Sequence, residues 1–305
     1  MRKKIIVSIL IVLSSVILFF IFGIFFFNNK KNFYSLPEIE FPQALGEEYS
    51  FSVVNSISDE KTKEINNKKE IVAYDTQKSN IDINILCKKL NIENKIKANN
   101  RDNTEYGDDI KKLIIQNDGK IVFQDMKLSN EELNLKDSEC IDIAEEFMDS
   151  IDLNSEELDV YGIVDITCND IDKPESKMII EKQVIFNRQI NGIDVYGDSK
   201  VIVAIKSDGS IGKFMANYNN LSTKIPIDKF NSVTTGIEKI KKYEGYIDVP
   251  ENTNQIELKN VEIKYWESED DSKSYVIQPV YEYTGKAYDG EEYLGTVKII
   301  EPMAY

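Results

Sequence analysis

The residue types in this 305-residue chain exclude several kinds of catalysis before any spacing is considered. Histidine is absent from the sequence. Ser-His-Asp and Cys-His catalysis and HExxH zinc hydrolysis all use an imidazole as base or ligand, so the chain cannot perform them alone. Carboxylates are abundant, but no pair is set apart by spacing or apolar surroundings as a catalytic acid and base. We therefore expect that the protein is not an enzyme and holds no cofactor.

The residues that commonly bind metals are poorly arranged for that purpose. Cys87, Cys140 and Cys168 are far apart in the sequence, and no C-x-x-C pair is present. They are expected to be small buried residues, with one disulfide as the alternative in an exported domain. The acidic run 267–271 lacks the alternating oxygen donors of a calcium loop and is expected to be a solvated hairpin tip. No metal site is predicted.

Two groups of side chains could bind a partner. The first surrounds an Asn-Gly bend, where Arg188 is expected to be an exposed cation; the alternative is that it only pairs with nearby carboxylates. The candidate partner-binding residues are Arg188, Asn191, Gly192, Asp194 and Tyr196. The second group is aromatic and could line a groove for a peptide or glycan, or form cross-strand pairs on a half-exposed sheet. Its members are Trp266, Tyr275, Tyr281, Tyr283, Tyr288 and Tyr293.

Charge divides the chain into two unequal parts. The formal net charge is −16, yet residues 1–31 carry five basic residues and no acidic one. The remaining residues therefore hold 32 basic side chains against 53 acidic ones. So acidic a surface repels phosphate backbones and anionic lipid headgroups, and binding to nucleic acid is not expected.

Residues 5–27 are apolar apart from three serines and a glycine. As a helix they would be roughly 35 Å long, enough to cross a hydrocarbon core of about 30 Å. The alternative is a cleaved signal peptide, but the run is too long and no A-x-A-like site follows it. We predict a single-pass anchor in the cell membrane, with a cytoplasmic N-terminus and an extracytoplasmic C-terminal region.

The rest of the chain contains a pattern that occurs twice. A hairpin around Asp118-Gly119 precedes a helix with Asp137 as its N-cap and with Cys140, Ala144, Phe147, Met148 and Ile151 on one face. A hairpin around Asp208-Gly209 precedes a helix with Phe230, Val233, Ile237 and Ile240 on one stripe and Asp228 as its N-cap. Strand-like runs follow each helix.

This repetition predicts an α+β fold class: an N-terminal transmembrane helix, then an exported region of tandem lobes, each a curved antiparallel sheet with one helix packed across it. Residues 80–92 are expected to form a short helix and 93–110 a solvated loop. The predicted divisions are a cytoplasmic tail at 1–4, the anchor at 5–27, a tether at 28–60, a poorly defined segment at 61–110, and lobes at 111–197 and 198–305.

The segment that contains the Asn-Gly bend resembles the PepSY and thermolysin-propeptide pattern. The resemblance rests on a strand, the bend, an apolar-x-apolar step, a long strand and an Asp-Gly hairpin. The matching residues are Phe186, Arg188, Asn191, Gly192, Val195, Gly197, Val201, Val203, Asp208, Gly209 and Ile211. Relatives of this kind inhibit proteases, so the resemblance implies, as one alternative, inhibition of a protease in trans.

The whole layout resembles the YycH/YycI-type regulators of the Gram-positive cell-wall two-component system. The closing strands, 261–285, carry this likeness together with the single N-terminal span. It implies a regulatory protein that contacts a membrane sensor kinase through the anchor and the exported region. The alternatives are protease inhibition in trans and an exported ligand-binding or envelope protein. The sequence does not indicate the oligomeric state.

Overall fold

The computed structural model describes residues 36–39, 41, 49–68, 71–127, 131–153, 155–170, 173–197, 199–227, 229–269 and 275–304. Residues 1–35 and 36–305 are separate units, and only the second is described here. The predicted anchor, residues 5–27, lies outside the described residues, as does Asp228. Within the ranges given, no helix is long and apolar enough to cross a membrane.

Strands dominate the described part of the chain. The strands are β1 (Ser52–Asn55), β2 (Val72–Lys78), β3 (Ile96–Asn99), β4 (Asn103–Gly107), β5 (Lys111–Gln116), β6 (Ile121–Asp125), β7 (Leu158–Asp170), β8 (Lys173–Ile190), β9 (Ile193–Tyr196), β10 (Lys200–Lys206), β11 (Ile211–Asn217), β12 (Asn219–Pro226), β13 (Tyr246–Asp248), β14 (Gln255–Glu269), β15 (Tyr275–Asp289) and β16 (Glu292–Pro302). The helices are α2 (Asp59–Asn66), α3 (Ile83–Lys89), α4 (Asp137–Asp149) and α5 (Val233–Ile240), with a 3₁₀ turn at Ser155–Glu157.

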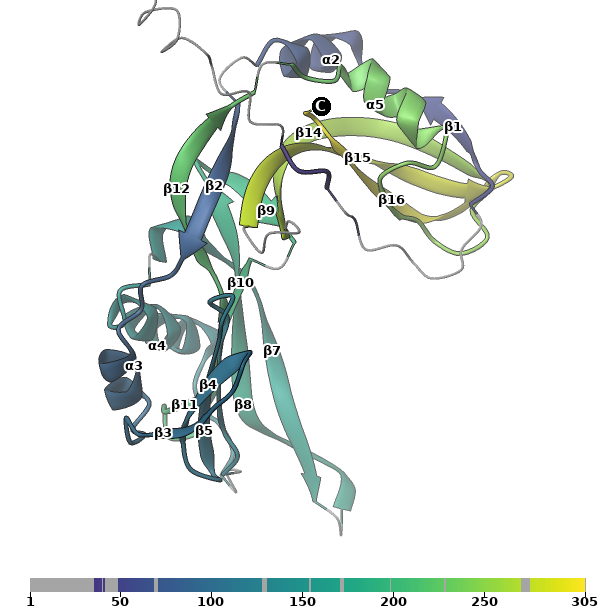
Figure 1. Cartoon of the computed structure of the whole chain (residues 1–305). Coiled ribbons are helices and arrows are strands. Elements are labelled where there is room, and N and C mark those ends of the chain that lie inside the picture. Colours follow the sequence, from purple (N-terminus) through teal and green to yellow (C-terminus); the bar gives the residue numbers. More distant parts are fainter. Residues whose placement is uncertain are drawn as a thin grey trace, which may run out of the picture. The chain divides into compact units, whose positions relative to one another are not determined.

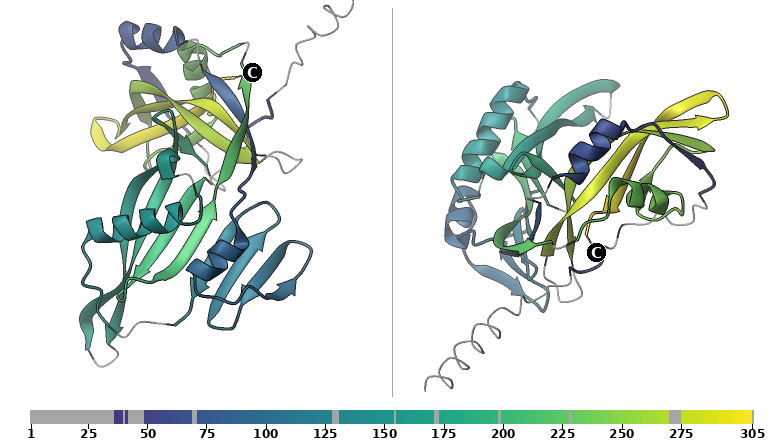
Figure 2. Two further views of the ribbon diagram at one scale, coloured as in Figure 1. Left: turned by 90° about the vertical axis from the view of Figure 1, so that its left-hand side faces the viewer. Right: turned by 90° about the horizontal axis from the view of Figure 1, so that it is seen from above.

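These strands form one mixed, 16-stranded sheet. Its main order is β12-β2-β15-β14-β9-β8-β10-β11-β6-β5-β4-β3, with β7 added beside β8, β16 beside β15, β13 beside β16 and β1 beside β14. Helix α4 packs on β8 and β10, whereas α2 packs on β14, α5 packs on β16, and α2 contacts α5 (Figure 1). Figure 2 shows the same helices and strands from two further directions.

The predicted α+β fold class of a transmembrane helix and tandem lobes is wrong. The described chain is a largely β structure in which one mixed sheet is continuous. The short strand β9 pairs with β8 through Gln189 and Ile190 and runs parallel to β14 beside Tyr265 and Trp266. The β10–β11 hairpin pairs with β8 and β6, which precede it by many residues. Local patterns indicated the hairpins and helices but not these long-range pairs.

The helix predicted from the apolar spacing near Asp137 is confirmed. In α4, Cys140, Ala144, Phe147 and Met148 are buried against the sheet. The predicted N-cap, Asp137, is instead the first residue of the helix. The N-cap is Lys136, whose backbone N–H donates to the Glu139 carboxylate at 2.8 Å. Burial of this apolar face, not the cap alone, is what stabilises a helix of this length.

The second predicted helix is also confirmed and covers a second hydrophobic core. In α5, Val233, Ile237 and Ile240 are buried. Its N-cap is Ser232 and not the predicted Asp228: the Ser232 hydroxyl accepts from the Thr235 N–H at 3.1 Å, as capping residues of this type commonly do. Phe230, predicted on the same stripe, lies before the helix, where it forms a β-bridge with Ala304. The segment 80–92 contains the expected short helix, α3.

The chain before residue 111 has more regular structure than expected. Residues 93–110, predicted to be a solvated loop, form β3 and β4, which extend the sheet from β5. Their polar side chains suit an edge hairpin that has little to bury. The charged run that begins at Asp59 forms α2, because Ser58 caps it and Ile65 is buried beneath it.

The three predicted turns are confirmed by their backbone angles. Gly119 and Gly209, each following an aspartate, have φ of +100° and +78°. Asn191 and Gly192 both have positive φ, 52° and 75°. Two successive residues with positive φ form a tight turn whose twist matches that of the flanking strands of a hairpin. This turn joins β8 to β9.

Candidate binding pocket

Arg188 is not the exposed cation that the sequence indicated. Its side chain is fully buried, with 0% exposure. The guanidinium donates to Glu157 Oε2 at 2.8 and 3.2 Å and to the Asn219 carbonyl at 2.7 Å. It also lies 4.4 Å from the centre of the Tyr218 ring. The alternative, pairing with a nearby carboxylate, is therefore confirmed, and these contacts indicate a structural role.

The other predicted partner-binding residues lie where β9 joins the two halves of the sheet. Asn191 and Gly192 are exposed in the turn. Asp194 pairs with Lys264 of β14 at 2.6 Å, and the Tyr196 hydroxyl donates to Glu282 of β15 at 2.5 Å. Burial, followed by the neighbouring Glu282 carboxylate, raises the pKa of Tyr196. The Asn191 amide also donates to the Tyr74 hydroxyl at 3.4 Å, so four of the five candidates, Arg188, Asn191, Asp194 and Tyr196, have partners within the chain.

The other candidate groups are mostly internal as well. Tyr281 and Tyr283 are buried, while Tyr288 and Tyr293 form a cross-strand pair with ring centres 6.0 Å apart. The three cysteines are free, and burial raises the pKa of the Cys87 and Cys140 thiols. The acidic run 267–271 was predicted to be a solvated tip, but residues 267–269 end β14 and Glu267 is buried, with 5% exposure; residues 270 and 271 lie outside the described residues. In the part that is described, no group of three or more potential ligands could hold a metal ion.

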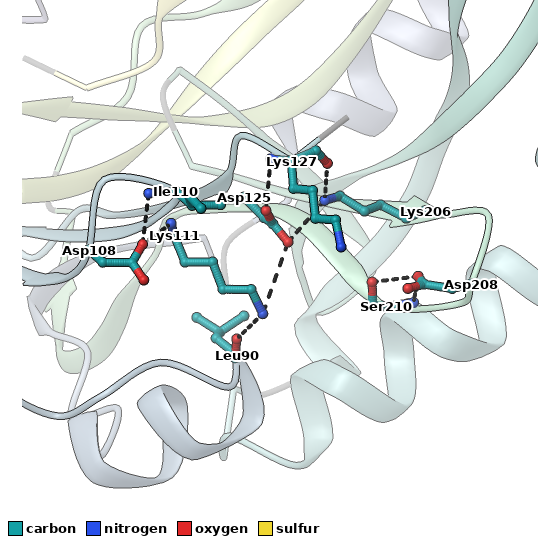
Figure 3. Close-up of polar contacts among 9 residues, drawn as sticks. All are labelled: Leu90, Asp108, Ile110, Lys111, Asp125, Lys127, Lys206, Asp208 and Ser210. Carbon is teal, nitrogen blue, oxygen red and sulfur yellow. Dashed lines mark hydrogen bonds and ion pairs between the residues drawn. The ribbon is translucent and has the colours of Figure 1, made fainter. Parts of the chain in front are cut away.

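A surface pocket of about 930 Å³ lies elsewhere, on the side of the sheet that α3 and α4 cover. Its walls come from α3, α4, the ends of β5, β6 and β10, and the β10–β11 turn. Figure 3 shows the charged residues at one end of it. Pockets of this size accommodate small organic ligands. We call it the lysine pocket, after Lys89, Lys111, Lys127 and Lys206, which line it.

One carboxylate organises the lysines at this end. Asp125, at the end of β6, lies 2.9 Å from Lys206 Nζ and 4.0 Å from Lys111 Nζ. Lys206 Nζ also donates to the Lys127 carbonyl at 2.7 Å, and Lys111 Nζ donates to the Leu90 carbonyl at 3.4 Å. The Asp125 and Lys206 side chains are only 8% and 10% exposed, so water screens their pair weakly.

The lining from α4 and the lining from the β10–β11 turn differ in character. From α4 come Ile143 and Phe147, and the Phe147 ring packs edge-on against Phe214 with centres 5.1 Å apart. From the β10–β11 turn comes Asp208, whose Oδ1 accepts from the Ser210 hydroxyl and N–H at 2.6 and 2.9 Å. These Ser210 hydrogen bonds lower the pKa of Asp208. The pocket therefore combines an apolar wall with a charged end.

Sequence reasoning did not find the lysine pocket. Its residues come from segments between positions 89 and 211, and none belongs to a recognisable motif. The available signals were the two Asp-Gly turns, which place the strand ends, and the apolar face of α4, which fixes where the helix packs. Neither signal identifies Lys111, Lys127 and Lys206 as neighbours, because that depends on the pairing of β11 with β6.

Comparisons with known proteins give distant structural likenesses. No protein-family model matches the chain, and no curated protein matches it. A crystal structure of an uncharacterized protein from Eubacterium rectale is 13% identical, with a TM-score of 0.43 over 75% of this chain and 81% of that one. The C-terminal domain of YpeB from Bacillus megaterium is 14% identical, with a TM-score of 0.31 over 73% of this chain and 99% of that domain. The PepSY-type and YycH/YycI-type resemblances stay predictions.

Proposed function

We propose that this chain is a membrane-anchored extracytoplasmic binding protein that modulates a membrane sensor kinase. The observation that carries the proposal is the lysine pocket, a ligand-sized depression in the part of the chain expected to lie outside the membrane. A binding protein of this kind needs a recognition site on a rigid scaffold and a connection to its partner. The pocket supplies the first, and the predicted anchor at 5–27 supplies the second.

The chemistry of the pocket favours binding over catalysis. Its most buried charged groups, Asp125 and Lys206, pair with each other. The Lys206 ammonium group also donates a hydrogen bond to the Lys127 carbonyl. Such a pair fixes the shape of the pocket and its local electrostatic potential. A nucleophile next to a base, which covalent catalysis needs, is not what these contacts provide.

The kinase is the finer part of the proposal and comes from the layout of the sequence. An apolar span flanked by basic residues would place a helix among the transmembrane helices of a partner. Occupancy of an extracytoplasmic pocket could then change kinase activity only if the ligand bound the active and inactive assemblies with different affinities. The exported region is thus the sensing part and the anchor the contact part.

Photo-crosslinking in intact cells tests this function. A photoreactive residue replaces Tyr161, which is 73% exposed on β7, or a residue within the span 5–27, and captured proteins are identified. We expect a sensor kinase to be captured from the span, and to be lost when residues 5–27 are replaced by an unrelated apolar sequence. Capture of a protease or of cell-wall components instead of a kinase would contradict the kinase proposal and favour trans inhibition or an envelope role.

A further inference from the structure

We propose that the lysine pocket binds a small organic oxyanion, a carboxylate or phosphate attached to an apolar group. This inference deepens the proposed binding function and rests on it. It follows from the positions of the lysines, from the pairs that they already make, and from the apolar side chains that line the same pocket.

The lysines near Asp125 carry more positive charge than this one carboxylate can balance. Lys111 and Lys206 share Asp125, and the Lys127 side chain extends past the same carboxylate (Figure 3). Within the described part of the chain, Lys127 makes no ion pair through Nζ, although its backbone N–H donates to Asp125 at 2.9 Å. Two ammonium groups thus share one carboxylate, and the Lys127 ammonium group has no ion pair with the described residues, so this end of the pocket holds more positive charge than Asp125 alone balances. An oxyanion placed between Lys111 and Lys127 would supply the missing acceptor.

The pocket lining contains equal numbers of acidic and basic residues. The positions of these charges, and not their sum, therefore determine where an anion would bind. Asp125, Glu131, Glu146 and Asp208 balance the four lysines that line the pocket. However, both hydrogen bonds from Ser210 occupy Asp208 Oδ1, and Glu146 belongs to α4, on the wall that also carries Ile143 and Phe147. The cationic groups cluster at the strand ends, where a ligand's anionic group would bind.

The acidity of the whole chain adds selectivity. A net charge of −16 repels anions at long range. At physiological ionic strength this repulsion is screened beyond about 8 Å, whereas lysines in direct contact act almost unscreened. Large polyanions would meet the acidic surface, but a small anion that enters the pocket meets Lys111, Lys127 and Lys206.

The apolar wall defines the rest of the ligand. Ile143, Phe147 and Ile211 line the pocket together with the lysines. An inorganic ion would leave this wall in contact with water. A ligand with an aromatic or short aliphatic body would cover it, and would gain from the apolar area removed from water.

Phenyl phosphate is a suitable probe because it joins an oxyanion to an aromatic ring. Its binding to the full-length protein in nonionic detergent is followed by line broadening of its aromatic protons in ¹H NMR, and the same measurement on benzyl alcohol gives the uncharged comparison. We expect saturable binding of phenyl phosphate, weakened roughly tenfold by Lys127→Gln, restored by Lys127→Arg and abolished by Lys127→Glu. Benzyl alcohol is expected to bind roughly tenfold more weakly than phenyl phosphate.

Lys127 is preferred over Lys206 as the test site because replacing Lys206 would break its pair with the buried Asp125. The matched control is Lys63→Gln on the exposed face of α2, which is expected to leave phenyl phosphate binding unchanged. The inference is overturned if the wild-type protein does not bind the probe at millimolar concentration, if Lys127→Gln binds as well as wild type, or if Lys63→Gln weakens binding equally. Kinase capture from the span would still stand in those cases, so the two proposals fail separately.

Discussion

Arg188 and the lysine pocket are two cationic sites on the same sheet, and they differ in how completely the fold uses them. Arg188 is fully buried, and its guanidinium has Glu157 and the Asn219 carbonyl as acceptors and Tyr218 as a stacking partner. In the pocket, Lys206 is similarly committed, but Lys127 is not paired in the described part of the chain. A cation whose donors are satisfied internally holds the structure together, whereas one that faces a pocket unpaired is available to a ligand.

The largest expected effect on stability comes from removing the buried Arg188 side chain. Arg188→Met is expected to lower the free energy of unfolding by about 3 kcal/mol, because it removes the cation that pairs with Glu157 and leaves the buried Asn219 carbonyl without the Arg188 donor. Urea denaturation followed by the fluorescence of Trp266, the single tryptophan, measures it. The exposed Arg101→Met is the control and should change stability by less than about 0.5 kcal/mol. Equal losses in both variants would contradict the structural role of Arg188.

Glu301 is a buried carboxylate that can be compared with Asp125, because it lacks the lysine partners that Asp125 has. Glu301 is 1% exposed, and its Oε1 makes no hydrogen bond to the described residues. Burial raises the pKa of Glu301 from 4.5 to about 7. The folded state therefore binds the proton more tightly than the unfolded state, and this group's contribution to stability decreases as the pH rises through that interval and is constant above it.

We expect Glu301→Gln to stabilise the protein at pH 8 by up to about 3 kcal/mol relative to wild type. The gain should vanish near pH 4, where the wild-type carboxyl is neutral in both states. Urea denaturation at the two pH values measures the difference, with the exposed Glu238→Gln as control. A gain that does not depend on pH would show that the fold does not raise the pKa of Glu301.

A smaller effect is expected where a buried hydroxyl ties a helix to the sheet. The Tyr283 hydroxyl donates to the Val233 carbonyl at the start of α5, at 2.9 Å. Tyr283→Phe removes this bond while keeping the ring and should cost about 1 kcal/mol of unfolding free energy. Tyr293→Phe, at a residue that is 54% exposed, is the matched change and should be nearly neutral. If both variants are neutral, the hydroxyl contributes nothing to the attachment of α5.

The smallest expected effect belongs to the ligand-facing side of the comparison. Lys127→Gln should change the free energy of unfolding by less than about 0.5 kcal/mol, since its ammonium group has no partner to lose in the described chain. The same denaturation assay measures it. A loss comparable to that of Arg188→Met would mean that Lys127 is structural after all, and it would remove the distinction between the two sites.

The local structure could be predicted because its signals are local. The apolar faces of α4 and α5 and the Asp-Gly and Asn-Gly turns each lie within a few residues, where helical periodicity or positive φ decides the conformation. The continuous sheet could not be predicted in this way. It depends on β9 pairing with both β8 and β14, and four residues carry no pattern that identifies a partner seventy residues away.

The sites show the same division. Arg188 was identified as important from its place beside the bend, but its burial depends on Glu157 and Asn219, which are distant in sequence. A charged residue in a sequence is normally assigned to the surface, and only the packing around it reverses that assignment. Predicting the lysine pocket would have required the relative positions of six separate elements, which the sequence does not give.

The most direct test of the central claim, regulation through the membrane, is a transcriptome comparison in the native cells. Cells that lack the protein are complemented with the wild-type chain or with a chain whose residues 5–27 are replaced by an unrelated apolar span. The proposal predicts that the wild-type chain restores the transcript pattern, whereas the chain with the replaced span reaches the membrane in equal amount and behaves like the deletion. Full restoration by the replaced span would contradict control of a kinase through the anchor.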